Sequence, residues 1–209
     1  MQLPKYIPKH TLRRLPLYMR AVRREADRGT VFISSETIAK EAQVHPVQVR
    51  KDLSVIKPSG RPGRGYFVNE LKEVLEKIFG VQSVNQAVLI GFGKLGRAIV
   101  GYPGFKRYGL DIAAIFDNDA NMIGKKEDGN TVFDVLDMPQ YIRKNKIQVG
   151  ILTVPAESAQ WVADLLVSCG ILAIWNFAPI TIEVPERVMV KDEDLAAGLA
   201  TLFYHIKDE

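Results

Sequence analysis

The sequence predicts an α/β protein in two parts: an N-terminal helical domain, and a C-terminal doubly wound parallel sheet followed by a terminal helix. Three observations predict this class. Apolar residues in the first 80 positions recur at helical spacing. From Val84 onward, short apolar runs alternate with helical segments, as in parallel strands joined by crossover helices. A glycine-rich turn follows the first of these runs. We expect domains over residues 1–80, 81–191 and 192–209.

The composition favours a packed chain in a reducing compartment. Of 209 residues, 47% are hydrophobic and 25% are charged. No apolar run reaches the roughly 18 residues of a membrane span, and the first residues lack the apolar segment of a secretory signal. The single cysteine, Cys169, has no partner for an internal disulfide. We therefore expect a cytoplasmic protein with no membrane partner.

Charge is distributed unevenly along the chain. Residues 1–80 carry 16 Lys and Arg against 8 Asp and Glu, whereas residues 81–209 carry 12 against 16. This asymmetry favours contact between the N-terminal part and a polyanion. A solubilising surface would carry the same charge, so the residue pattern has to decide between them.

The first predicted helix carries an apolar stripe. Its members are Leu12, Leu15, Met19, Val22 and Ala26. Proline lacks a backbone donor, so we expect Pro16 near the helix start or at a kink. Gly29 suits the position just past the end of the helix.

Two short helices follow, joined by the tight connection Gln43-Val44-His45. Ser34 or Ser35 can cap the first, and Pro46 suits the first turn of the second. The second helix turns Val49, Leu53 and Ile56 inward and its polar residues outward. Such a pair is typical of a helix-turn-helix, whose second helix enters the major groove of DNA.

The segment SGRPGRGYFV comes next and sets Arg61 and Arg64 among glycines. Glycines permit a tight hairpin tip, and arginines on it can reach phosphates or a minor groove. The sequence therefore predicts a winged helix-turn-helix. Its candidate DNA-binding residues are Gln48, Arg50, Lys51, Ser54, Arg61 and Arg64. The alternative is an amphipathic helix pair with a solvated basic face.

The segment AVLIGFGKLGRAIVG places Gly91, Gly93 and Gly96 between an apolar strand and a helix. This spacing is typical of the Rossmann turn, which binds a dinucleotide pyrophosphate at a helix N-terminus. Asp117 ends the next strand, 21 residues beyond Gly96, where an acid accepts hydrogen bonds from the adenosine ribose. An acid there repels a 2′-phosphate, so the sequence predicts NAD(H) as the cofactor.

Two further loops follow predicted strands and are expected at the same edge of the sheet. They are Thr153-Val154-Pro155-Ala156 and Asn176-Phe177-Ala178-Pro179. Both can wall a nicotinamide pocket. The complete set of predicted cofactor-binding residues is Gly91, Phe92, Gly93, Lys94, Leu95, Gly96, Asp117, Thr153, Val154, Pro155, Phe177, Ala178 and Pro179.

The sequence favours binding without turnover. None of the three histidines follows a predicted strand, and Tyr102 and Lys106 form a Y-x-x-x-K pattern that Pro103 and Gly104 interrupt. We see no substrate domain and no metal cluster, so we expect no catalysis and no metal. Two alternatives stay open: an NAD-dependent oxidoreductase with a helical N-terminal appendage, and a CoA- or nucleotide-binding module.

The whole chain resembles the Rex family of redox-sensing transcriptional repressors. The matching segments are RRLPLYMR, SSETIAKEAQV, VRKDLS, GFGKLGRAI, YPGF, IFDND, LTVPAE, NFAP and DLAAGL. The resemblance implies a homodimer that binds palindromic operators with NAD⁺ or no cofactor and is released by NADH. It also implies that Arg20, Tyr102 and Asp194 act in switching at the dimer interface, and that the terminal helix is exchanged between protomers. The apolar residues of that helix fit equally well with packing on its own domain, so this alternative stays open.

One segment departs from the family pattern. Where the family carries an aromatic SYFG stretch before the wing and a small apolar residue between its last glycines, this chain has SVIKPSG and Arg64. The sequence therefore leaves the operator open.

Overall fold

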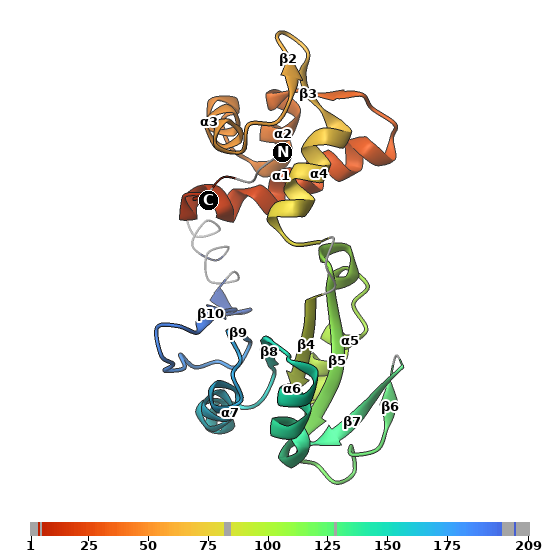
Figure 1. Ribbon diagram of the computed structural model, residues 1–209, viewed down its shortest axis with the longest axis vertical. Coiled ribbons are helices and arrows are strands. Elements are labelled where there is room, and N and C mark those ends of the chain that lie inside the picture. Colours follow the sequence, from red (N-terminus) through yellow and green to blue (C-terminus); the bar gives the residue numbers. More distant parts are fainter. Residues whose placement is uncertain (1–3, 5, 82–84, 128, 198–202, 204–209) are drawn as a thin grey trace. The chain divides into compact units, whose positions relative to one another are not determined.

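The computed structural model describes residues 4, 6–81, 85–127, 129–197 and 203. The chain divides into two compact units, Met1–Ser83 and Val84–Glu209 (Figure 1). Each unit has a hydrophobic core of its own.

Unit 1, in its described residues, combines four helices with a small sheet. In chain order its elements are α1 (Lys9–Asp27), β1 (Phe32–Ile33), α2 (Ser35–Ala42), α3 (Pro46–Ile56), β2 (Gly60–Arg61), β3 (Gly65–Phe67) and α4 (Val68–Ile78). The strands are antiparallel in the order β1-β3-β2. Sequence reasoning did not anticipate α4, which packs on α1.

Helix α1 differs from expectation at Pro16. The proline lies inside the helix, well past the start at Lys9, so the expected place near the helix start is wrong, whereas a kink at Pro16 stays a prediction. It removes one backbone hydrogen bond, a loss that burial of the apolar face of α1 offsets. That face includes Thr11, whereas Leu12 is 43% exposed.

The local signals of the helix-turn-helix are confirmed. The Ser34 hydroxyl accepts a hydrogen bond from the Thr37 N–H at 3.1 Å and so caps α2. Gln43 adopts a left-handed conformation with φ +53°, which ends α2. Pro46 begins α3, and Val49, Leu53 and Ile56 are buried.

The described part of unit 2 is built on one seven-stranded sheet. Its elements are β4 (Asn85–Ile90), α5 (Lys94–Val100), η1 (Phe105–Tyr108), β5 (Leu110–Asp117), β6 (Lys126–Glu127), β7 (Asn130–Asp134), η2 (Val135–Asp137), α6 (Met138–Asn145), β8 (Val149–Leu152), α7 (Ala156–Ser168), β9 (Ala173–Asn176) and β10 (Met189–Asp192). The order is β10-β9-β8-β4-β5-β7-β6, parallel except for β6.

This order makes unit 2 a doubly wound Rossmann sheet. Ala87 and Leu89 of β4 join Ile99 of α5 in the core on one face. Val88 and Ile90 pack on the opposite face, against residues of α6 and α7. The chain proceeds from β4 to β5 on one side and returns to β8 on the other. Ligands of such sheets bind where this reversal leaves a crevice, at the carboxyl ends of the two central strands.

The expected terminal helix, 192–209, falls mostly outside the described residues, which lack 198–202 and 204–209. Its exchange between protomers therefore stays a prediction. In the part of the chain that the structure describes, every helix is too short or too polar to cross a bilayer.

Candidate functional site

The glycine turn between β4 and α5 needs glycine at two positions for steric reasons. Gly91 has φ +96°, and a Cβ there would lie 2.7 Å from the Thr153 carbonyl oxygen. A Cβ on Gly96 would lie 2.2 Å from the Gly91 carbonyl oxygen. A Cβ on Gly93 would meet no atom within 4 Å. The turn is thus packed tightly on the protein side and open at Gly93.

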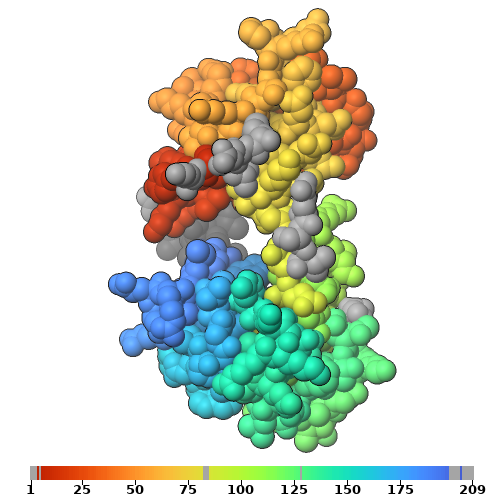
Figure 2. All heavy atoms as spheres, viewed as in Figure 1, coloured from red at the N-terminus to blue at the C-terminus, as the bar shows by residue number. Residues whose placement is uncertain are grey.

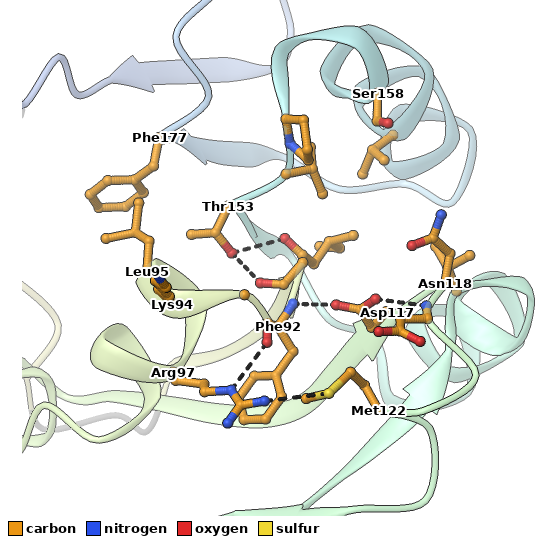
Figure 3. Close-up of a pocket in the computed structure, with 18 of the residues that line it drawn as sticks. Phe92, Lys94, Leu95, Arg97, Asp117, Asn118, Met122, Thr153, Ser158 and Phe177 are labelled. Atoms are coloured by element: carbon orange, nitrogen blue, oxygen red, sulfur yellow. Dashed lines mark hydrogen bonds between the residues drawn. The ribbon is translucent and has the colours of Figure 1, made fainter.

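Thr153 joins the turn to the loop after β8. Its hydroxyl lies 2.7 Å from the Gly91 carbonyl oxygen and 3.0 Å from that of Ile90, as the dashed lines of Figure 3 show. Its backbone N–H donates to Ile90 at 2.9 Å. The two loops at the switch point are therefore held together by hydrogen bonds.

Asp117 ends β5 beside the turn. Its carboxylate accepts hydrogen bonds from the Phe92 N–H and, at 2.8 Å, from the Asp119 N–H. A carboxylate has about four acceptor positions, so two remain for hydroxyl groups of a ligand. The arrangement suits a carboxylate that receives a ribose diol.

These loops enclose a cleft of about 960 Å³ within unit 2. Figure 3 shows Phe177 and Leu95 at one end of the cleft and Asp117 and Asn118 at the other. Eleven of the predicted cofactor residues line it: Gly91, Phe92, Gly93, Lys94, Leu95, Asp117, Thr153, Val154, Pro155, Phe177 and Pro179. A cleft this long, with apolar walls and a few polar groups, suits a dinucleotide.

Two predicted residues do not line the cleft. Gly96 lies beneath the turn, where its missing side chain lets α5 approach Gly91. Ala178 is 6% exposed, and its N–H donates to the buried Asn176 amide at 3.0 Å. Both residues are buried behind the cleft lining and help to hold its loops in place.

Sequence reasoning missed further lining residues. They include Arg97, Met122, Val135, Ser158, Trp161 and Val162. The Arg97 guanidinium lies 5.2 Å from the Phe92 ring centre and donates to the Met122 sulfur at 3.3 Å. Arg97 directly follows the last glycine of the turn, so its place could have been inferred. Trp161 is 53% exposed on α7, and its sequence position alone gave no sign of that exposure.

A metal centre finds no support in the described residues, where no group of three or more His, Cys, Asp or Glu side chains is close enough to hold an ion. Of the three histidines, His45 caps α3 by accepting the Val47 N–H at 3.2 Å.

A second candidate surface lies on α3. Arg50, Lys51 and Ser54 are exposed there. Arg50 donates to the Ser35 hydroxyl at 3.0 Å, which holds its guanidinium beside the start of α2. Gln48 is half-buried, and its amide donates to the Asp52 carboxylate at 3.1 Å.

Asp52 is the main feature of this domain that sequence reasoning missed. Its side chain is 2% exposed and binds Arg14 through two hydrogen bonds of 2.7 and 2.8 Å. Burial by itself would raise the pKa of Asp52, but hydrogen bonds from Arg14, Tyr18 and Thr11 outweigh it and lower the pKa to about 2. Burial and the Asp52 carboxylate both raise the pKa of Tyr18. The Arg14–Asp52 pair therefore stays ionised at neutral pH.

The β2–β3 hairpin has the predicted form of a wing. Gly65 has φ +98°, and a Cβ there would lie 2.2 Å from the Ile33 carbonyl oxygen. The Arg61 guanidinium lies 5.7 Å from the ring centres of both Phe32 and Phe67. Arg64 lies 5.8 Å from Phe32. Figure 2 shows the hairpin tip projecting from the surface of its unit, with both arginines exposed.

The three predicted switch residues lie in separate segments of the chain. Arg20 of α1 donates to Glu41 of α2 at 3.0 Å. Tyr102 is 58% exposed and stands edge-on to Phe105, with the ring centres 5.0 Å apart. The Asp194 carboxylate accepts the Ala196 N–H at 2.8 Å and the Ala197 N–H at 3.0 Å, so it caps the start of the terminal segment.

Comparison with known proteins matches both units. A family profile described as "CoA binding domain" matches residues 82–180, and one described as "Putative DNA-binding protein N-terminus" matches residues 6–54. The chain is 41% identical to "Redox-sensing transcriptional repressor Rex" of Bacteroides thetaiotaomicron, over 94% of this chain and 90% of the relative.

Two solved structures are similar over almost the whole chain. One is "RSP in complex with beta-NAD+ and operator DNA", with TM-score 0.90 and 36% identity over 98% of this chain and 94% of the other. The second is "RSP in complex with beta-NADH", with TM-score 0.87 and 35% identity over 98% and 96% of the two chains.

Proposed function

This chain belongs to the Rex family of redox-sensing transcriptional repressors, and on that premise we propose that it represses transcription according to the balance of NADH and NAD⁺. One observation carries the proposal: an open glycine turn and Asp117 face one cleft in a chain that also presents a basic helix and wing. We assign DNA binding to residues 1–80, NAD(H) binding to 81–191 and dimerisation to 192–209, in the cytoplasm.

The cleft residues divide along its length. Residues Gly91 to Gly96 would hold the pyrophosphate, with the open face of Gly93 against it. Asp117 would accept the adenosine ribose hydroxyls. The opposite end, at Leu95 and Phe177, would enclose the nicotinamide, together with Thr153, Val154, Pro155 and Pro179.

This end of the cleft favours the reduced cofactor. The oxidised nicotinamide ring carries a positive charge, whereas the reduced ring is neutral. Removing a cation from water beside the apolar Leu95 and Phe177 costs free energy, and Lys94 in the lining adds repulsion. Discrimination between NADH and NAD⁺ thus follows from the side chains at one end of the cleft.

The DNA-binding residues fall into two groups. Arg50, Lys51 and Ser54 face outward from α3, which would lie in the major groove with Gln48. Arg61 and Arg64 would contact phosphates or the minor groove from the wing. A homodimer would place two copies of α3 about one helical turn apart, roughly 34–36 Å, on a palindromic operator.

Switching requires that NADH bind the DNA-incompetent state more tightly than the DNA-competent state. We propose that Arg20, Tyr102 and Asp194 take part in this switch at the dimer interface. The bonds of Arg20 to Glu41 and of Asp194 to backbone N–H groups would then be exchanged for others when the state changes.

The proposal is tested by titrating the protein–operator complex with each dinucleotide separately, at fixed salt because DNA affinity depends steeply on ionic strength. NADH is expected to release the DNA at concentrations at which NAD⁺ does not. Equal release by both would contradict the sensor function. Steady oxidation of NADH with a small carbonyl compound, without specific DNA binding, would instead favour the oxidoreductase.

The profile match described as CoA binding supports one further candidate ligand. CoA carries a 3′-phosphate on its ribose, and Asp117 beside that ribose would repel it. We therefore expect CoA to compete poorly with NADH, and strong competition would favour the nucleotide-binding module.

A further inference from the structure

The buried Asp52 carboxylate connects α1 with α3 through a complete set of hydrogen bonds. Oδ1 accepts from the Thr11 hydroxyl at 2.7 Å, Arg14 Nη2 at 2.8 Å and Gln48 Nε2 at 3.1 Å. Oδ2 accepts from Arg14 Nε and the Tyr18 hydroxyl, both at 2.7 Å. Three of the four partners belong to α1, and Gln48 alone belongs to the outer part of α3.

The carboxylate decides which way the Gln48 amide points. An ionised carboxylate only accepts hydrogen bonds, so the amide has to turn its Nε2 toward Asp52. Arg14 keeps Asp52 ionised at neutral pH, because the paired guanidinium stabilises the charged form. The amide oxygen Oε1 and one Nε2 proton stay available to other partners.

Gln48 is not needed to satisfy Asp52. Arg14 neutralises the charge with two hydrogen bonds, and Thr11 and Tyr18 add two more from the buried side. Gln48 is half-buried and lies one helical turn before Asp52 on α3, with Lys51 as its neighbour three residues along the helix surface. The main effect of the bond is therefore to fix the orientation of the Gln48 side chain, and Asp52 needs it little as a source of hydrogen bonds.

We infer that Asp52 is a positioning residue for base recognition, which fixes the Gln48 amide so that its Oε1 acceptor is presented to the major groove. In that groove, hydrogen-bond donors are the N6 amino group of adenine and the N4 amino group of cytosine. Gln48 then selects adenine or cytosine over guanine or thymine on the strand that it contacts, at one position of each half-site. This inference rests on the proposed function of α3 as the recognition helix.

The test is selection of preferred sequences from a randomised DNA duplex pool by the full-length protein with NAD⁺. Four proteins are compared: wild type, Gln48→Ala, Asp52→Asn and Tyr18→Phe. Tyr18→Phe is the matched control, since it removes a buried bond to Oδ2 and leaves the Oδ1 partners of the carboxylate in place.

We expect Gln48→Ala and Asp52→Asn to lower the preference at the same half-site position, by about fivefold to tenfold. Tyr18→Phe is expected to lower thermal stability and to leave that preference unchanged. If Gln48→Ala relaxes a position that Asp52→Asn leaves intact, or if all three variants relax all positions alike, the inference is overturned. A wild-type protein that selects no sequence would instead overturn the proposed function.

A second measurement on the wild-type protein keeps the inference testable if Asp52→Asn does not fold. In protein labelled with ¹⁵N at glutamine, the Gln48 side-chain signal is assigned with the Gln48→Ala variant. One Gln48 amide proton is expected to exchange slowly with water, in free protein and in the DNA complex alike. Rapid exchange of both protons in either state would overturn the inference.

Discussion

The Thr153 hydroxyl lies 2.7 Å from the carbonyl oxygen of Gly91, and this contact joins the loop after β8 to the turn after β4. The two residues are 62 positions apart in the chain and come from the two strands that flank the switch point. Gly91 accepts this close approach only because it lacks a Cβ. The shape of the cofactor cleft therefore depends on one hydroxyl group and one missing side chain.

Replacing Thr153 with valine tests this contact. The side chain keeps its shape but loses the hydrogen bond, and the carbonyl oxygens of Ile90 and Gly91 lose a donor. We expect the free energy of unfolding to fall by about 1 kcal/mol. Affinities for NADH and NAD⁺, measured by calorimetry, should fall together by about the same factor, because the turn, as we propose, holds the pyrophosphate that both share.

The matched control is Thr131→Val, the same change in β7 outside the cleft lining. It should leave both affinities unchanged. A Thr153→Val variant that loses NADH affinity alone would show that Thr153 acts on the nicotinamide ring and not through the turn.

Asp117→Asn is expected to change which dinucleotide the cleft accepts. The carboxylate binds the Phe92 and Asp119 N–H groups and, as we propose, the ribose hydroxyls. Loss of its charge weakens hydrogen bonds to the ribose and removes repulsion of a 2′-phosphate. NADH affinity should fall about tenfold or more, and the preference for NADH over NADPH should shrink, as measured by cofactor titration.

Asp164→Asn on α7 is the control, because Asp164 is exposed outside the cleft lining and makes a comparable side-chain bond, to Gln160 at 2.9 Å. It should alter neither affinity. If Asp117→Asn reduced NADH and NADPH affinities equally, the carboxylate would stabilise the glycine turn without discriminating between the two cofactors.

Features carried by local sequence were predictable. The glycine spacing, the cap at Ser34 and the acid at Asp117 each depend on residues near one another in the chain, where one residue type has a clear physical advantage. Strands β4, β5, β8 and β9 were predictable for the same reason, because buried parallel strands appear in the sequence as short apolar runs. Eleven residues of the cleft lining could therefore be placed without the structure.

Features that depend on partners far along the chain were not predictable. Asp52 sits between basic and apolar residues of α3, and only the fold brings Arg14 and Tyr18 of α1 to its carboxylate. The expectation that Pro16 lies at the helix start was wrong because packing of α1 overrides the local preference of proline. The exposure of Trp161 likewise depends on how α7 lies beside the cleft.

The Asp52 network predicts a dependence of stability on pH. The pKa of Asp52 is lowered from its usual 3.8 to about 2 in the folded protein. A lowered pKa stabilises the folded state fully above the unfolded value, and this contribution is lost as the pH falls from about 5 through 2. At 1.4 kcal/mol per pKa unit, its size is about 2 kcal/mol.

Asp52→Asn should remove that contribution, and it should destabilise unit 1 by about 3 kcal/mol at pH 7 because the Arg14 charge loses its partner. Hydrogen exchange of the α1 and α3 amides measures both effects in the intact chain. A variant with the same steep loss of protection below pH 5 as the wild type would show that other carboxyl groups govern acid unfolding of this unit.

The wing arginines should strengthen DNA binding with little dependence on sequence. Arg61 and Arg64 stand at the hairpin tip, and their guanidinium groups are preorganised by the Phe32 and Phe67 rings. We expect Arg61→Ala and Arg64→Ala each to weaken specific and non-specific DNA binding by a similar factor. Removing one arginine–phosphate interaction should reduce the slope of log affinity against log salt by about 1.

Arg143→Ala, an exposed arginine near the end of α6 in unit 2, is the control and should leave the slope unchanged. A different result would contradict this prediction: weaker binding of either wing variant to A·T-rich operators but not to other DNA, with the salt slope unchanged. The arginine would then contact the minor groove and not the phosphates, because narrow A·T-rich grooves attract inserted arginines.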